Sequence, residues 1–435
     1  MLAPRAAVWL KERVAACPAG HSLRLQLPPQ PAVSAINLLA AAPALAVAGC
    51  WCRVHWLRAR RAGTRRRGGC SALQAQDPEV GVVLVNIGTP VSTSVEDVRD
   101  YLSRFLGNQR VMDIQDAKSR QKAVDSLLSS RPAISAEKYR RIWHPVHGSP
   151  LLHNTEQLRA ALQGQLGDRY EVHIGFQYSE PSLATALKTL AERAGKIVLI
   201  PMFPHFAQAT VAASLVQACE AAVALGCASS LKVVRPFYKS PGYIEAVSQL
   251  VGRHVGDDGR NFDHIVFSFH GIPERQCTST DDTETVCSKV PDCCSRRSVE
   301  TRNCYRSQCL ETAELVARRL GLPEGSWSMS FQSRAALRRE IEWTRPYTDE
   351  LLASLPGMGL RRVALCSPSF TADCIETLGE LGHDCNDIFL AAGGKELCLI
   401  PSVNSWPCWV RSVADMVRVT ASDQASPGTG GFWAM

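Results

Sequence analysis

Three carboxylates follow an apolar strand in the stretch CSPSFTADCIETLGELG, which runs from Cys366 to Gly382. Asp373, Glu376 and Glu380 are spaced three and four residues apart, so in a helix they can share one face, with Glu380 furthest out. Carboxylates on one face can hold a divalent cation or move protons. Acidic residues also suit the start of any solvated helix, so this stretch alone leaves both interpretations open.

A histidine ends another apolar strand, in the sequence SFHGIP. Gly271 and Pro273 turn the chain away directly after His270. A neutral imidazole that faces carboxylates suits proton abstraction combined with the handling of a divalent cation. A satisfied structural histidine has the same local sequence, so His270 by itself is open to both interpretations.

Apolar runs alternate with amphipathic stretches from residue 80 onward. We predict strands over 80–87, 171–177, 196–202, 231–238, 263–269, 327–331, 361–366, 387–391 and 397–400. We predict helices over 182–194, 210–225, 308–320, 348–355, 373–381 and 407–418. Runs rich in Val and Ile between helices are typical of parallel strands covered on both faces, which gives a three-layer α/β/α sandwich.

The sequence also indicates a duplication. GVVLVNIGTP (81–90) and HIVFSFHGIP (264–273) are both strands that end in a turn with Gly and Pro. We therefore predict two similar Rossmann-like halves, over 76–255 and 256–420, with a cleft between them at the carboxyl ends of the strands. Residues whose side chains could take part in binding or catalysis lie at such strand ends: Asn86, Tyr178, His205, His270 and Asp373.

The excess positive charge of the chain belongs to its first 75 residues. They hold eleven Lys and Arg and a single acid, Glu12, whereas the remainder holds 37 bases and 40 acids and gives no reason to expect nucleic acid. An Ala- and Arg-rich segment that is almost free of acids is typical of a transit peptide. The apolar stretch 35–52 is alternatively a membrane span, which Asn37 and Pro43 make marginal. We predict that 1–75 is a removed or disordered targeting region for a mitochondrion or plastid, and that 421–435 is a flexible tail.

Seven motifs together resemble the ferrochelatase family, and they cover roughly residues 80 to 410. They are NIGTP (86–90), GSPL (148–151), IGFQY (174–178), SFHGIP (268–273), FQSR (331–334), PYTDE (346–350) and SPSFTADCIETLGEL (367–381). The order and the residues of these motifs are most similar to those of the proteobacterial type of the enzyme. The resemblance implies chelatase-type halves and the insertion of Fe²⁺ into protoporphyrin IX to give protohaem, with release of two protons.

The resemblance also implies residue roles. His270 would accept protons or contact the iron, and Glu376 and Asp373 would hold the hydrated cation or carry protons away. The residues implied to contact the macrocycle are Phe370, Trp343, Tyr178, Ile87 and Ser149. The apolar substrate and product imply peripheral association with a membrane, such as the matrix side of the mitochondrial inner membrane, and a homodimer is compatible with the family.

The chain departs from the family pattern at several positions. Cys374 stands where many relatives have His, and we interpret it as a buried structural thiol rather than a metal ligand. Ile87 stands where many relatives have Met. His144 and His147 flank Pro145, so we predict that they lie in a loop and are not ligands.

A cysteine insert over 277–309 is the most individual part of the chain, with six cysteines in 33 residues. Some ferrochelatases carry a [2Fe–2S] cluster in this region, and a zinc site would use the same residues. An exposed loop of oxidisable thiols is the third interpretation. The ligands that we predict are Cys304 and Cys309, then Cys287 and either Cys293 or Cys294.

Two other functions stay open on the sequence. One is the insertion of another metal, or the use of a coproporphyrin, and the other is a haem or porphyrin carrier without catalysis. The presence of both His270 and Glu376 argues against the carrier, because binding alone would not need both residues.

Overall fold

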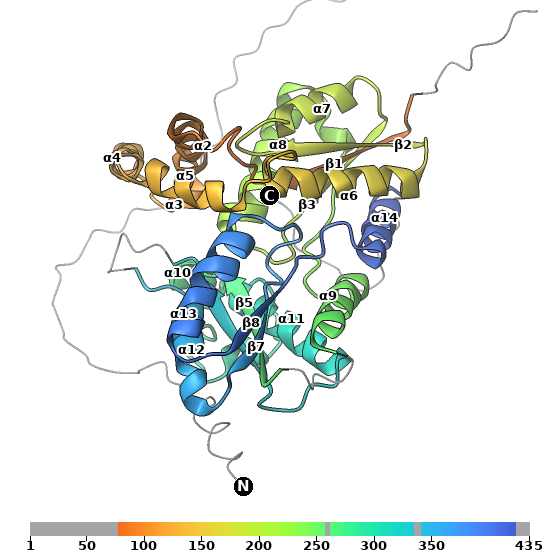
Figure 1. Ribbon diagram of the computed structural model, residues 1–435. Coiled ribbons are helices and arrows are strands. Elements are labelled where there is room, and N and C mark those ends of the chain that lie inside the picture. Colours follow the sequence, from red (N-terminus) through yellow and green to blue (C-terminus); the bar gives the residue numbers. More distant parts are fainter. Residues whose placement is uncertain (1–76, 257–261, 335–340, 423–435) are drawn as a thin grey trace, which may run out of the picture. The chain divides into compact units, whose positions relative to one another are not determined.

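Two four-stranded parallel sheets form the framework of the structure (Figure 1). This computed structural model describes residues 77–256, 262–334 and 341–422, so the predicted targeting region and nearly all of the predicted tail lie outside the described residues. The first sheet has the order β2-β1-β3-β4, with β1 (Val80–Asn86), β2 (Tyr170–Phe176), β3 (Lys196–Pro201) and β4 (Leu231–Val233). The second has the order β6-β5-β7-β8, with β5 (His264–His270), β6 (Trp327–Gln332), β7 (Arg362–Cys366) and β8 (Glu396–Ile400).

The two sheets repeat one topology, which confirms the predicted fold of two similar α/β halves. In each sheet the first strand of the half lies between the second and third strands, and all pairings are parallel. All residues of β1 are buried, as are all but the last residue of β5, because helices cover both faces of these central strands.

Helices fill the connections within each half. In the N-terminal half these are α2 (Val95–Gly107), α3 (Gln109–Met112), α4 (Ala117–Leu128), α5 (Arg131–Ile142), α6 (Pro150–Leu166), α7 (Leu183–Ala191), the π-helix η1 (Gln208–Ala212), α8 (Ala213–Ala224) and α9 (Pro241–Val255). In the C-terminal half they are α10 (Glu274–Thr278), α11 (Tyr305–Arg319), α12 (Thr348–Ser354), the π-helix η5 (Ile375–Asp384), α13 (Cys385–Ala391) and α14 (Pro407–Ala421). Figure 1 shows α2 to α5 gathered as one group beside the N-terminal sheet.

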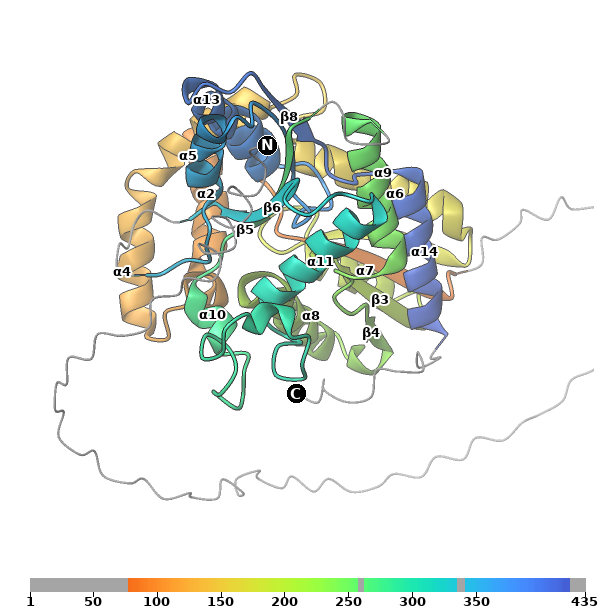
Figure 2. The same ribbon diagram turned by 90° about the horizontal axis from the view of Figure 1, so that it is seen from below.

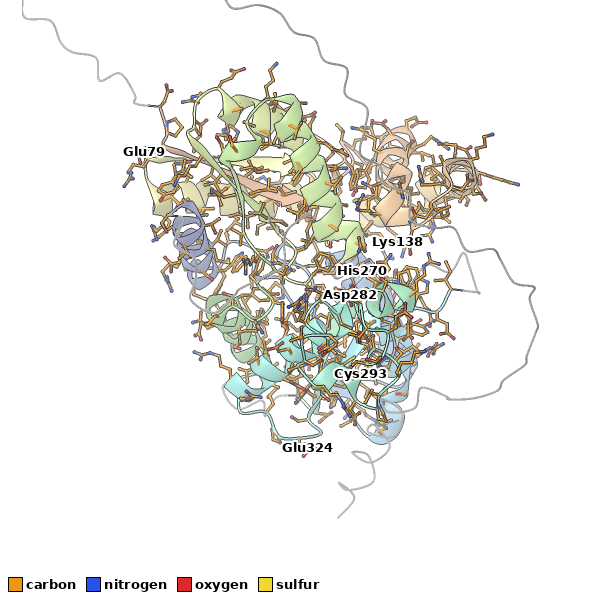
Figure 3. The ribbon with its side chains drawn as sticks, turned by 180° about the vertical axis from the view of Figure 1, so that it is seen from behind. Glu79, Lys138, His270, Asp282, Cys293 and Glu324 are labelled. Atoms are coloured by element: carbon orange, nitrogen blue, oxygen red, sulfur yellow. The ribbon has the colours of Figure 1, made fainter. Side chains whose placement is uncertain are left out.

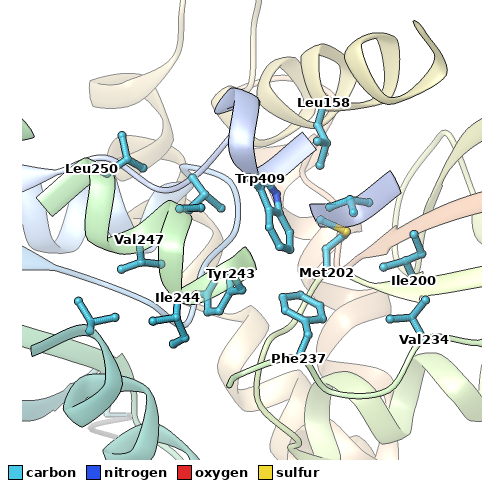
Figure 4. Packing of buried hydrophobic residues seen from close by; sticks show 14 of the residues in the cluster. Leu158, Ile200, Met202, Val234, Phe237, Tyr243, Ile244, Val247, Leu250 and Trp409 are labelled. Carbon is cyan, nitrogen blue, oxygen red and sulfur yellow. The ribbon is translucent and has the colours of Figure 1, made fainter. Parts of the chain in front are cut away.

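One hydrophobic core joins the two halves. α14, the last helix of the described chain, packs against α6 and α9, and α9 in turn packs against α11 (Figure 2). Trp409 of α14 is fully buried, with its ring centroid 5.3 Å from Phe237 and 5.4 Å from Tyr243 (Figure 4). The described residues therefore belong to a single compact unit, and the boundary that we predict near residue 255 stays a prediction.

Three predicted elements differ clearly in the structure. The predicted strand 231–238 ends at Val233, and the residues after it do not belong to the sheet. The predicted strand 387–391 is wrong, because these residues belong to α13, where Phe389 is buried while Ile388 and Leu390 are exposed at 37% and 43%. A short apolar run does not distinguish a strand from a helix that buries one side. The predicted helix 373–381 begins later, at Ile375, and is a π-helix that extends to Asp384. Among the described helices none is long and apolar enough to cross a membrane, and the stretch 35–52 lies outside that range.

Candidate active site

A cavity of about 560 Å³ lies at the carboxyl ends of both sheets. Residues that end or follow a strand line it: Asn86 and Ile87 (β1), Met202 (β3), His270 (β5) and Phe370 (β7). Helices α2 to α4 add apolar side chains, among them Leu102, Phe105, Met112 and Leu127, and α5 adds Arg131 and Ser135. A largely apolar cavity of this size with a few polar groups is typical of a site for a small molecule or cofactor, and it lies where the duplicated strands predict the cleft.

The imidazole of His270 is held in one tautomer. Its Nδ1 lies 2.7 Å from the carbonyl oxygen of Gly271, which can only accept, so Nδ1 carries the proton. Nε2 is then the unprotonated nitrogen, and His270 lines the cavity with its ring 6.2 Å from that of Phe370. Figure 3 labels His270 among the side chains of the C-terminal half. The geometry suits a proton acceptor or a metal contact.

The acidic residues that follow β7 do not share one role. Glu376 lines the cavity, as predicted from its place one turn inside the helix. Asp373 does not: it is 6% exposed, and its carboxylate accepts hydrogen bonds from Ser402 N–H (3.1 Å), Thr377 Oγ1 (3.0 Å) and Asn404 Nδ2 (2.8 Å). These bonds hold two loops together and leave Asp373 away from the cavity wall.

Glu380 points inward, contrary to the sequence-based expectation that it lies further out. Ser333, whose φ of 65° is rare outside glycine, donates to its carboxylate from the backbone N–H (2.7 Å) and from the hydroxyl. Burial raises the pKa of Glu380, and the charge of Glu376 raises it further, while Ser333 and the charge of His270 act in the opposite direction. The spacing places the carboxylates on one face, but it cannot show the hydrogen bonds from Ser333, 47 residues away, that hold Glu380 in place.

The residues predicted to contact a macrocycle divide into two groups. Phe370, Trp343 and Ile87 line the cavity. Tyr178 is buried behind Phe105, 5.4 Å away edge to face, and burial raises its pKa to about 12. Ser149 faces a smaller cavity of about 20 Å³ on the other side of Glu376, where its hydroxyl accepts from Thr89 Oγ1 at 2.8 Å.

Two arginines of the cavity wall were not singled out by sequence reasoning. Arg131, the first residue of α5, places a permanent positive charge in an otherwise apolar wall. Arg275 of α10 pairs with Asp113 at the end of α3 (2.6 Å), which ties the two halves together at the edge of the cavity. Neither belongs to a motif whose spacing signals chemistry, so only the tertiary structure shows them.

A family model described as Ferrochelatase matches residues 79–421. The chain belongs to the ferrochelatase family. A ferrochelatase of Azotobacter vinelandii is 39% identical over 339 residues, which are 78% of this chain and 98% of that protein. One from Coxiella burnetii is 36% identical over 341 residues, 78% of this chain and 93% of that protein. The resemblance that the motifs predict is thereby confirmed.

A solved structure described as SirB from Bacillus subtilis with Fe³⁺ shows a weaker likeness. Its TM-score is 0.43 at 13% identity, and the match covers 64% of this chain and 93% of that chain. The family assignment depends on the sequence relatives.

The cysteine insert of this ferrochelatase gathers thiols around Cys304. Cys277, Cys287 and Cys294 are its thiol neighbours, and their interaction with its sulfur lowers the pKa of Cys304. Cys293 is adjacent, with its sulfur 3.9 Å from that of Cys294; Figure 3 labels Cys293.

The predicted ligand set changes at one position. Cys309 is fully buried beside Tyr305, and it makes no thiol hydrogen bond to the group around Cys304. Cys277, which sequence reasoning did not select, occupies that place instead. As they stand, no three or more His, Cys, Asp and Glu side chains within the described ranges are arranged to hold a metal ion.

The histidines of the loop after α5 lie as predicted. His144 and His147 fall between α5 and α6, and Nδ1 of His144 accepts from the backbone N–H of His147 at 3.0 Å. Cys374 is buried at 5% exposure and also lines both cavities, so its role as a structural thiol stays a prediction.

Proposed function

We propose that His270, Glu376 and Glu380 carry out the family reaction in the 560 Å³ cavity. That reaction is the insertion of Fe²⁺ into protoporphyrin IX, which gives protohaem and releases two protons. The observation that carries the proposal is that His270 and Glu376 line the same cavity, while the Gly271 carbonyl accepts from Nδ1 of His270 and leaves Nε2 as the ring's possible acceptor.

The chemistry explains these residue types. Two pyrrole N–H groups must lose their protons as the cation enters, so a base has to lie beside the macrocycle. His270 Nε2 takes up a proton there, and the carboxylate of Glu376 replaces water around the incoming Fe²⁺, which as a substrate cation prefers N and O ligands. Glu380, whose pKa is raised by burial, is able to hold a proton that passes on from the cavity.

The walls suit the rest of the porphyrin. Phe370, Trp343 and Ile87 offer apolar and aromatic contact to a flat macrocycle. Arg131 offers a charge partner for a propionate, because a carboxylate in an apolar site is stable only when it is paired. Asp373 is not part of this proposal as a ligand, since its carboxylate already accepts three hydrogen bonds.

An anaerobic insertion assay tests the proposal. The purified chain is mixed with protoporphyrin IX and Fe²⁺, and protohaem is followed by its absorbance. We expect turnover with protoporphyrin IX, and a KM for porphyrin that rises about tenfold in Arg131→Ala, the loss expected for one charge-assisted contact. If the protein inserted iron into a coproporphyrin but not into protoporphyrin IX, the proposed substrate would be wrong. If it bound porphyrin without inserting iron, the alternative of a porphyrin carrier without catalysis would be favoured.

We further infer that the cysteine insert binds a [2Fe–2S] cluster through Cys277, Cys287, Cys294 and Cys304. Four soft thiolates suit Fe–S or zinc. The four thiols are neighbours but are not arranged as ligands, so binding requires loss of their protons and a turn of the side chains toward the metal. Bound there, the cluster would supply structural support to the start of α11 and an electron-accepting centre.

Two single substitutions separate this ligand set from the one that the sequence predicts. Protein purified without oxygen should be reddish and lose visible absorbance on reduction with dithionite. We expect Cys304→Ala to bleach it, whereas Cys309→Ala keeps the colour, because Cys309 lies outside the thiol group. About one zinc per chain without acid-labile sulfide would show that the insert is a zinc site and not an Fe–S site. A colourless protein without metal would show that the cysteines form a loop of free thiols.

We also propose that residues 1–75 direct the chain to a mitochondrion or plastid, and that the mature enzyme associates peripherally with a membrane because its substrate and product are apolar. The segment's eleven basic residues and single acid support this reading. A fluorescent reporter fused behind residues 1–75 should enter the organelle, and the chain that starts at Asp77 should keep near-normal turnover. A reporter that stays in the cytosol would refute the targeting role.

A further inference from the structure

The backbone of His270 lies beyond the end of regular sheet pairing on one side. β5 pairs with β7 only as far as Phe267, which lies opposite Cys366. Hydroxyl groups take over from there: Ser367 Oγ donates to the carbonyl of Ser268 (2.8 Å), and the N–H of His270 donates to Ser369 Oγ (3.1 Å). On this side the chain at His270 is therefore held by side chains, whereas on the other side it pairs with Gln332 of β6.

Tyr305 supplies the last of these hydroxyls. Its OH donates to the carbonyl oxygen of His270 at 2.8 Å and lies 3.2 Å from Ser369 Oγ. The side chain is 6% exposed and lines the cavity, and its ring packs edge to face on His205 with centroids 5.8 Å apart. Removal of the OH would leave the His270 carbonyl without this donor, next to the Gly271 carbonyl that sets the tautomer of the imidazole.

The position of Tyr305 connects this bond to the cysteine insert. Tyr305 is the first residue of α11, and Cys304, the residue before it, is the one around which the thiols of Cys277, Cys287 and Cys294 gather. A change in that thiol group alters the chain at the start of α11, one residue away from the hydroxyl that holds His270.

We propose that Tyr305 is a positioning residue for His270 and transmits the state of the cysteine insert to it. The inference rests on the proposed role of His270 in metal insertion, and it adds a regulatory link to the same site. Tyr305 touches the histidine backbone, whereas the reacting atoms belong to the imidazole and the porphyrin.

The variant Tyr305→Phe removes one oxygen and keeps the ring. We expect kcat for metal insertion to fall about tenfold, which corresponds to one lost hydrogen bond, while KM for porphyrin stays within about twofold. Tyr101→Phe is the matched control, because Tyr101 is also buried and its OH donates to a backbone carbonyl, that of Gly88, at 3.0 Å, but it does not line the cavity. Equal kcat values for Tyr305→Phe and wild type, or equal losses in both variants, would overturn the inference.

A readout apart from activity separates this inference from the proposed function. In protein with ¹⁵N-labelled histidine, His270 should show a single tautomer protonated at Nδ1, and its signals are identified by their loss in His270→Gln. We expect Tyr305→Phe to give a mixture of tautomers whether or not the protein inserts metal. A wild type without insertion activity refutes the proposed function, whereas an unchanged tautomer in Tyr305→Phe refutes the positioning role.

A double-mutant cycle tests the link to the insert. Cys304→Ala should lower kcat in the wild-type background and have little further effect in Tyr305→Phe, because both act through the same bond. Cys294→Ala, at the edge of the thiol group, provides a second cycle if Cys304→Ala does not fold. If the cysteine substitution lowered kcat by the same factor in the wild type and in Tyr305→Phe, the insert would not act on His270 through Tyr305.

Discussion

Replacement of His270 by alanine should abolish metal insertion while porphyrin still binds. His270 lines the cavity, and the hydrogen bond of Nδ1 to the Gly271 carbonyl leaves Nε2 of the neutral ring as the proposed acceptor, so its loss leaves the pyrrole protons without a base. Loss of a general base typically costs on the order of a hundredfold or more in rate. Binding is expected to persist, because Phe370, Trp343 and Ile87 remain. Protohaem formation and the quenching of intrinsic fluorescence by porphyrin measure the two properties separately.

A histidine away from the cavity gives the control. His254 lies on α9, its Nδ1 interacts with the carbonyl of Leu250 at 2.8 Å, and it does not line the cavity. His254→Ala should insert metal within about twofold of wild type. Turnover of His270→Ala within a few-fold of wild type would contradict its assignment.

Replacement of Glu376 by glutamine should give the second-largest loss, on the order of a hundredfold in kcat. Glu376 lines both the main cavity and the small cavity behind it, so its carboxylate lies where an entering cation loses water. Glutamine keeps the size of the side chain and removes the charge. The assay is kcat for insertion at saturating porphyrin and varied Fe²⁺.

The substitution Glu380→Gln tests whether catalysis depends on a buried group of carboxylates or on the general negative charge of the surface. From the sequence we expect a small effect, but Glu380 is hydrogen bonded to Ser333 and is sensitive to the charges of His270 and Glu376, so we now expect about a tenfold loss. Asp387→Asn, on the exposed side of α13, should change kcat by less than about twofold. If Glu376→Gln, Glu380→Gln and Asp387→Asn lowered kcat equally, the negative charge of the region as a whole, and not the position of each carboxylate, would determine the rate.

The sequence predicted the framework well because its signals are local and strong. Runs such as VGVVLVN in β1 and HIVFSFH in β5 bury their residues along their length, and a continuous apolar run between helices has few other solutions. The two Gly-Pro turns after these strands also revealed the repeat, which the matching strand orders confirm. The short run at 387–391 failed, because helix and strand are equally compatible with so few apolar residues.

By itself, the sequence determined the fold class and the family, and it placed His270 and Glu376 after strand ends; the contacts of Ile87, Trp343 and Phe370 were implied by the family resemblance, and all five residues line one cavity. Strand ends in parallel sheets meet at one edge, so residues placed there converge without further information. Only the tertiary structure decided how the side chains divide their roles. Hydrogen bonds from distant loops hold Asp373 away from the cavity and Glu380 against Ser333, and Tyr305 reaches His270 across 35 residues of sequence. Such contacts depend on packing between elements, which no local pattern of residues encodes.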